Sequence, residues 1–180
     1  WLMEELEILQ SAEESEKLAG SVDSTEGVYF VSAFNGLGTP HWDENAKACI
    51  LGMKGGTGKA HIVRAALEGI AYQVRDILHA VYGEKLPSGV LLADGGMTAN
   101  SWLMQFQADI VGMTVVRNKM EDSSATGAAY IAGLKLGIWK NIDEIKALAK
   151  EKEYYEPKME KEKAEELYRG WLKAVEKART

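Results

Sequence analysis

The residues best suited to ligand chemistry are two consecutive glycines that follow a short apolar run. Val90 to Ala93 leads into Asp94, Gly95 and Gly96, and a helix is predicted to begin with Thr98 as its cap. Paired glycines let a ligand approach the backbone closely, and the helix that follows directs free N–H groups to the same place. This order predicts a nucleotide site, and it leaves open whether phosphate or the adenosine end is held. A tight turn without a ligand has the same spacing.

A second glycine-rich segment, Lys54 to Ala60, resembles a phosphate-binding P-loop but departs from that motif twice. Met53 stands where the first glycine should be, and Ala60 replaces the serine or threonine that would bind magnesium. The segment also lacks a long apolar strand before it. We therefore predict a mobile surface loop in which Lys59 faces solvent.

A third loop, Asn35 to Trp42, combines two glycines with an aromatic ring that could stack on a ligand. The favoured interpretation is structural: Pro40 fixes the exit of the loop and Trp42 plugs an edge of the core.

An acidic pair, Glu121 and Asp122, precedes a helix of small residues that extends to Gly133. Carboxylates at this place favour N-capping and pairing with the helix dipole over acid–base chemistry. The small residues predict close approach to another element, either in ordinary tight packing or at an inter-domain hinge.

The segments that position these loops alternate between strands and helices. The clearest is His61 to Val81, where apolar residues recur every three or four positions. Strands are predicted at residues 27–33, 48–53, 90–93 and 114–117, and helices at 1–9, 61–81, 98–111, 123–133, 141–150 and 164–175. The helix from Thr98 is expected to end at Gly112. This alternation predicts an α/β domain with a sheet that is at least partly parallel.

Composition excludes several classes of partner. Apolar residues make up 46% and charged residues 27% of the chain, and the net charge is −6, which argues against nucleic acid or anionic lipid. No apolar run reaches the roughly 20 residues of a membrane span. The single cysteine, Cys49, excludes an internal disulfide and fits a reducing compartment. The histidines are too widely separated for a metal site: His41, His61 and His79.

Five segments together carry a resemblance to a known family. They are Phe34 to Asp43 (FNGLGTPHWD), Ala48 to Glu68, Asp94 to Asn100, Leu103 to Ile110, and Glu121 to Gly133. The first is similar to a glycerol kinase loop that normally reads FTGLGAPYWD, and the second matches a signature of the FGGY carbohydrate kinases. The LMQFQAD run is typical of the glycerol enzymes more than of pentulose kinases. The chain therefore resembles the glycerol kinases of the FGGY family.

The resemblance implies an actin-like, ribonuclease H-like ATPase domain, C-terminal part, with additional C-terminal helices. It implies that residues 1–180 form a single domain, and that the N-terminal domain and the first strands of this domain lie outside the chain. The family's adenosine contacts fall on Gly96 and Asn100, with Gly95 adjacent, whereas the catalytic aspartate and the glycerol contacts lie elsewhere. The implied protein is a cytoplasmic homo-oligomer that uses ATP, with ADP as product, and Mg²⁺ to phosphorylate glycerol. The chain alone is expected to be inactive.

Departures from the family pattern lie at loop or cap positions: Asn35, His41, Glu44, Ser123 and Ser124. They leave open another polyol or sugar substrate, such as a pentulose. A different class of function, a docking or assembly module without its own ligand, is suggested by the charged surface and amphipathic helix from Pro157 to Thr180.

Overall fold

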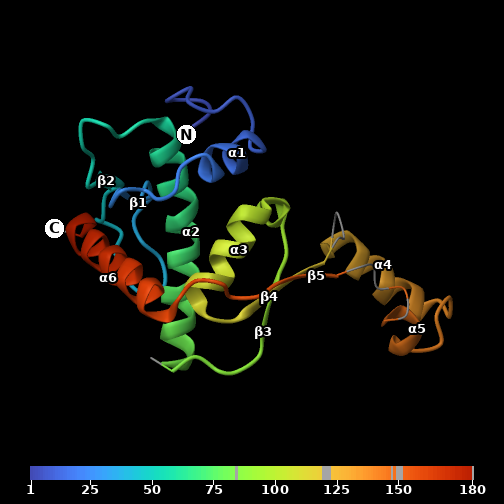
Figure 1. The fold of residues 1–180 in the computed structure, drawn as a ribbon. Helices are drawn as coiled ribbons and strands as arrows, with labels where there is room; N and C mark the ends of the chain where they lie inside the picture. Colours follow the sequence, from blue (N-terminus) through green and yellow to red (C-terminus); the bar gives the residue numbers. More distant parts are fainter. Residues whose placement is uncertain (84, 119–122, 147, 149–151, 180) are drawn as a thin grey trace.

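A computed structural model describes residues 1–83, 85–118, 123–146, 148 and 152–179. The main body is built around the long helix α2 (Lys59–Tyr82), against which α1 (Glu14–Gly20), α3 (Ser101–Val111) and α6 (Lys161–Ala178) pack (Figure 1). The helical periodicity from His61 to Val81 and the stop at Gly112 are confirmed, because Gly112 ends α3 with a left-handed φ of 66°.

The core lies where α2, α3 and α6 meet. The ring of Tyr72 stacks on Trp171 with 5.4 Å between ring centroids, and its edge meets Phe106 at 5.6 Å. Beside them the buried carboxylate of Asp76 accepts hydrogen bonds from the Tyr168 hydroxyl at 2.6 Å and the Trp171 indole at 2.8 Å. These bonds satisfy a buried charge and fix α6 onto α2, as its apolar stripe predicts.

Two separate sheets accompany the helices. The first pairs β1 (Tyr29–Val31) with β2 (Cys49–Leu51) in antiparallel fashion, and both strands are shorter than predicted. The second has the order β3-β4-β5, in which β3 (Val90–Ala93) is parallel to β4 (Thr114–Asn118). The predicted α/β class with a partly parallel sheet is confirmed.

Strand β5 (Lys152–Tyr155) is antiparallel to β4 and was not predicted. It lies in the strongly charged segment from residue 151 to 166, whose composition hides it. Its alternation is nevertheless regular, since Glu153 and Tyr155 are half-buried while Lys152 and Tyr154 are exposed. Pairing with β4 therefore outweighs the low strand propensity of lysine and glutamate.

The predicted opening helix at residues 1–9 is wrong. The chain there makes hydrogen-bonded turns, and Glu7 has a positive φ of 52°, which an α-helix does not accommodate. The apolar residues of this segment pack against the body without helical periodicity. Trp1 packs its ring against Phe30 and Phe34, and Leu9 is buried. The first regular helix is α1.

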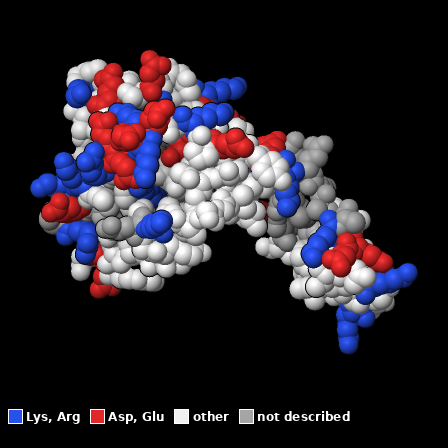
Figure 2. Space-filling view, turned by 60° about the horizontal axis from the view of Figure 1, so that its bottom comes forward, with Lys and Arg blue, Asp and Glu red and all other residues white. Residues whose placement is uncertain are grey.

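Helices α4 (Ser123–Lys135) and α5 (Ile142–Lys146) project from the end of the second sheet, away from the body (Figure 1). The helix predicted at 141–150 is observed only over α5, which Asn141 caps by accepting a 3.0 Å bond from the Glu144 amide, and Lys150 lies outside the described residues. Few charged side chains surround the hollow between body and projection (Figure 2). None of the helices in the described ranges is long and apolar enough to cross a membrane.

Candidate functional site

The glycine pair lies at the end of β3, in a turn that holds its backbone open. Gly95 has φ 98° and ψ 168°, a conformation essentially restricted to glycine, and Gly96 begins a 3₁₀ turn that ends at Ala99. A Cβ added at Gly95 or Gly96 would meet no atom within 4 Å. The backbone of both residues is therefore exposed to a ligand.

The helix after this turn is capped by Asn100 and not, as predicted, by Thr98. The Asn100 side-chain oxygen accepts a 2.8 Å hydrogen bond from the Leu103 amide, which is the N-cap geometry. Thr98 closes the turn instead, because its hydroxyl and amide both donate to the Gly95 carbonyl, at 2.7 and 3.0 Å. The 3₁₀ turn therefore moves the cap of α3 two residues along the chain, from the predicted Thr98 to Asn100.

Asn100 is only 9% exposed and is held at both ends of its amide. Its nitrogen donates to the Ser15 hydroxyl at 3.2 Å, which ties the turn to α1. The three predicted site residues, Gly95, Gly96 and Asn100, thus lie in one turn, with the glycines open and the asparagine bracing it.

An apolar cavity of about 340 Å³ lies beside the turn. Met97, which follows Gly96, and Ser15, which bonds Asn100, both line it, and the rings of Trp1, Phe30 and Phe34 form other parts of its wall. Sequence reasoning missed this cavity because its lining comes from segments far apart in the chain. A concave apolar space with a few polar groups at its edge suits a flat heterocycle.

A half-buried arginine contacts the turn from the side of the sheet, and no sequence signal indicated it. Arg117 of β4 donates to the Thr98 carbonyl and pairs with the Glu153 carboxylate of β5. Tyr155 of β5 lies beneath the guanidinium, with 5.7 Å from its carbon to the ring centroid, and burial raises the pKa of the Tyr155 hydroxyl.

The P-loop-like segment is an exposed loop, as predicted. A Cβ at Gly55 or Gly56 would meet no atom within 4 Å, and the loop is closed by the Thr57 hydroxyl accepting from the Lys54 amide at 2.9 Å. Lys59 faces solvent with 55% of its side chain exposed, 3.7 Å from Glu14. Unlike the Gly95 turn, this loop borders none of the cavities described here.

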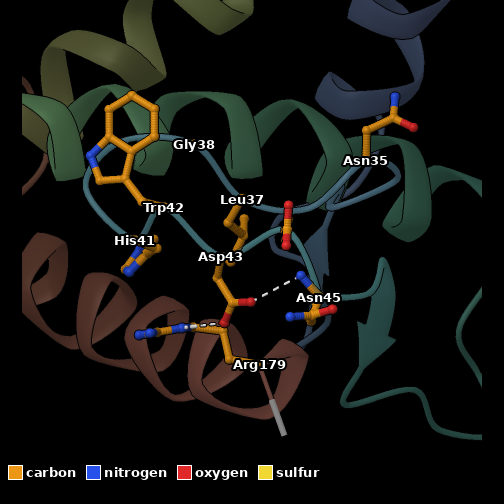
Figure 3. A pocket seen from close by; sticks show the side chains of 9 residues that line it. Asn35, Leu37, Gly38, His41, Trp42, Asp43, Asn45 and Arg179 are labelled. Atoms are coloured by element: carbon orange, nitrogen blue, oxygen red, sulfur yellow. Dashed lines mark hydrogen bonds and ion pairs between the residues drawn. The ribbon is translucent and has the colours of Figure 1, made fainter.

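The loop from Asn35 to Trp42 does not plug the core. Trp42 is 79% exposed, so that prediction is wrong, and its ring points away from the Asp43–Arg179 pair (Figure 3). The loop and the end of α6 enclose an open cavity of about 510 Å³. Asp43 organises it by accepting from the Asn45 amide and the Arg179 guanidinium, both at 3.0 Å. The Arg179 pairing holds the pKa of Asp43 below its usual range.

The acidic pair Glu121 and Asp122 lies outside the described residues. At the other end of α4 the tight-packing interpretation fits, because a Cβ on Gly133 would overlap the Trp139 ring at 2.0 Å. Among the described residues no group of three acidic, histidine or cysteine side chains could hold a metal ion.

Comparison with known proteins places this geometry in a family. Residues 1–136 match the model of the C-terminal domain of the FGGY family of carbohydrate kinases. The chain belongs to this FGGY family. It is 44% identical over its full length to a glycerol kinase of Coxiella burnetii and 50% identical over 99% of its length to one of Caldanaerobacter subterraneus, and it spans 36% of each of those proteins.

Solved FGGY structures agree. A crystal structure of Plasmodium falciparum glycerol kinase with ADP superposes with a TM-score of 0.86 at 35% identity, covering 99% of this chain and 36% of that one. A xylulose kinase from Lactobacillus acidophilus has a TM-score of 0.76 at 22% identity over 99% of this chain and 36% of that one, which shows the shared fold. The predicted actin-like, ribonuclease H-like architecture is confirmed.

Proposed function

We propose that the protein is an ATP-dependent glycerol kinase and that this chain supplies its adenosine-binding side. The observation that carries the proposal is the open Gly95-Gly96 backbone next to an apolar cavity of about 340 Å³. The similarity to a glycerol kinase crystallised with ADP gives the ligand class.

The parts of the turn divide the work of binding. Gly95 and Gly96 let the nucleoside lie against bare backbone, the cavity wall at Met97 receives the adenine ring, and Asn100 keeps the turn in register with α1. Adenosine binding is favoured over phosphate binding here, because the cavity beside the turn is apolar and Asn100 already caps α3. Binding energy of this kind positions ATP, and phosphoryl transfer depends mainly on positioning and charge neutralisation.

No catalytic residue is assigned to this chain, and we assign no Mg²⁺ ligand to its described residues. The metal would travel with the ATP phosphates and neutralise their charge. Glycerol as substrate is favoured by 44% to 50% identity to curated glycerol kinases. Assembly into a homo-oligomer and a cytoplasmic location stay predictions from the resemblance.

We also propose that further strands complete this domain. Among the residues that the structure describes, strand β3 pairs with β4 alone, which leaves one edge of its backbone open, and Leu92 is 66% exposed. An unprotected edge and apolar face are uncommon in a finished sheet. The chain spans about a third of its glycerol kinase relatives, whose remaining length could supply these strands.

The test is ADP production by the whole polypeptide that contains this chain, with glycerol, D-xylulose and gluconate offered separately. We expect ATP-dependent turnover with glycerol at a kcat/KM well above the values for D-xylulose and gluconate. Turnover with D-xylulose and not glycerol would replace glycerol by a pentulose, and no turnover with any acceptor would contradict the kinase function.

A further inference from the structure

We propose that Arg117 is a positioning residue that holds the Gly95-Gly96 turn in its observed conformation. Strand β5 contributes to the nucleotide site indirectly, because its Glu153 holds Arg117 in place. The inference rests on the proposed nucleotide function of that turn. It assigns a role to a segment that lies beyond residue 136, where the match to the FGGY domain model ends.

The sheet places Arg117 behind the turn. In the parallel register Arg117 is opposite Ala93, the last residue of β3, and in the antiparallel register it is opposite Glu153 of β5. Its guanidinium therefore lies between the end of β3 and the carboxylate of the next strand. From there it donates to the Thr98 carbonyl and to Glu153.

The contact with Thr98 is transmitted to the glycines. The Thr98 amide and hydroxyl both bond the Gly95 carbonyl, so a fixed Thr98 carbonyl fixes the peptide that precedes Gly96. A guanidinium suits this task because its rigid fork can hold a backbone oxygen and a carboxylate at once. Only 15% of the Arg117 side chain is exposed, so water competes weakly for these bonds.

A second set of contacts connects β5 to Ser101, the residue that follows Asn100. The Tyr155 hydroxyl lies 2.9 Å from the Glu153 carboxylate and 3.3 Å from the hydroxyl of Ser101, the first residue of α3. Glu153 thus connects to Thr98 through Arg117 and to Ser101 through Tyr155. These two sets of contacts, at Thr98 and at Ser101, lie on either side of the cap residue Asn100. Together they resist rotation of the turn.

The chain offers a matched control arginine. Arg75 also donates to one backbone carbonyl (Ile110), pairs with one glutamate (Glu165) and lies over one tyrosine (Tyr168), and its Nε makes one further bond, to His79 at 3.2 Å. Its carbonyl contact is at the far end of α3, away from the glycine turn. Loss of Arg75 should lower stability as much as loss of Arg117 without reaching the nucleotide.

The experiment compares Arg117→Gln, Arg117→Lys and Arg75→Gln with the unmodified protein, each made in the whole polypeptide that contains this chain. Amide hydrogen exchange without nucleotide reports the turn at residues 95–100, and calorimetric titration reports ADP affinity. We expect Arg117→Gln to speed exchange at the turn about tenfold and weaken ADP binding about tenfold, as for one lost charge-assisted bond. Arg117→Lys should recover part of both effects, and Arg75→Gln should change neither while lowering the melting temperature.

Unchanged exchange at residues 95–100 in Arg117→Gln would overturn the positioning role, whatever happens to ADP. A loosened turn with undiminished ADP affinity would overturn it as well. Failure of the unmodified whole polypeptide to bind ADP would count against the nucleotide function, while the positioning role of Arg117 would still be judged by the exchange result. Should Arg117→Gln fail to fold, Tyr155→Phe removes only the second set of contacts and should speed exchange at Ser101 by a smaller factor, and no change there would contradict the proposal.

Discussion

Two glycine-rich turns of this protein differ in what surrounds them and not in how open their glycines are. Gly95 and Gly96 follow a parallel strand, belong to a turn whose Met97 lines an apolar cavity, and are held by Asn100 and Arg117. Gly55 and Gly56 are equally open, but their loop is closed by short-range contacts, such as the bond between the Lys54 amide and the Thr57 hydroxyl. Glycine content alone therefore does not make a nucleotide site, and the positioning of the turn by neighbouring elements does.

The largest contrast is expected from Gly96→Val compared with Gly56→Val. A Cβ added at either position meets no atom within 4 Å and neither glycine has a positive φ, so each variant should change the free energy of unfolding by about 0.5 kcal/mol or less. Gly96→Val should weaken ADP binding about 100-fold, or about 2.7 kcal/mol, because the side chain fills the ligand's space. Gly56→Val should leave the affinity unchanged. Equal ADP affinities in calorimetry would break the contrast.

A second contrast concerns backbone strain. Gly95→Ala forces an L-residue into φ 98°, ψ 168°, which should lower the free energy of unfolding by about 2 kcal/mol. Gly55→Ala meets no such restriction and should be close to neutral. Urea denaturation of both variants measures the difference, and a neutral Gly95→Ala would mean that the turn has no fixed conformation.

The cap of α3 should have a smaller effect. Asn100→Ala removes the bond to the Leu103 amide and the bond to Ser15, and should cost about 1 kcal/mol of stability. Asn100→Asp retains an acceptor for the cap but cannot donate to Ser15. Its stability should therefore lie between those of the unmodified protein and Asn100→Ala. Thermal melts of the three proteins test this order. If Asn100→Ala were as stable as the unmodified protein, the proposed role of Asn100 in holding the turn would be contradicted.

The smallest effect is expected at the P-loop-like segment, residues 54–60. Lys59→Ala removes an exposed ion pair with Glu14 at 3.7 Å and should change stability by less than about 0.5 kcal/mol. ADP affinity should not change either. A marked loss of ADP binding would restore the P-loop interpretation of residues 54–60 that the sequence departures reject.

The sequence predicts the elements whose pattern is local. The periodicity of α2, the apolar run of β3 and the stop at Gly112 follow from spacing and backbone preference, and the glycine turn follows from its place after β3. The cap moved from Thr98 to Asn100 because a 3₁₀ turn intervenes, which spacing does not reveal.

What the sequence does not predict depends on contacts between distant segments. β5 is hidden in a charged stretch, and its pairing with β4 gives Glu153 its partner Arg117. The cavity beside the turn combines Trp1, Phe30 and Met97, and the same apolar residues at the start of the chain suggested a helix that does not form. The predicted helix failed because tertiary packing outweighs weak local preference.

The most direct test of the account is amide hydrogen exchange of the whole polypeptide that contains this chain, with and without saturating ADP. The account predicts slower exchange with ADP at residues 95–100 and at Ala12 and Ser15, which line the cavity, and no change at residues 54–58. Protection at residues 54–58, or none at residues 95–100, would contradict it.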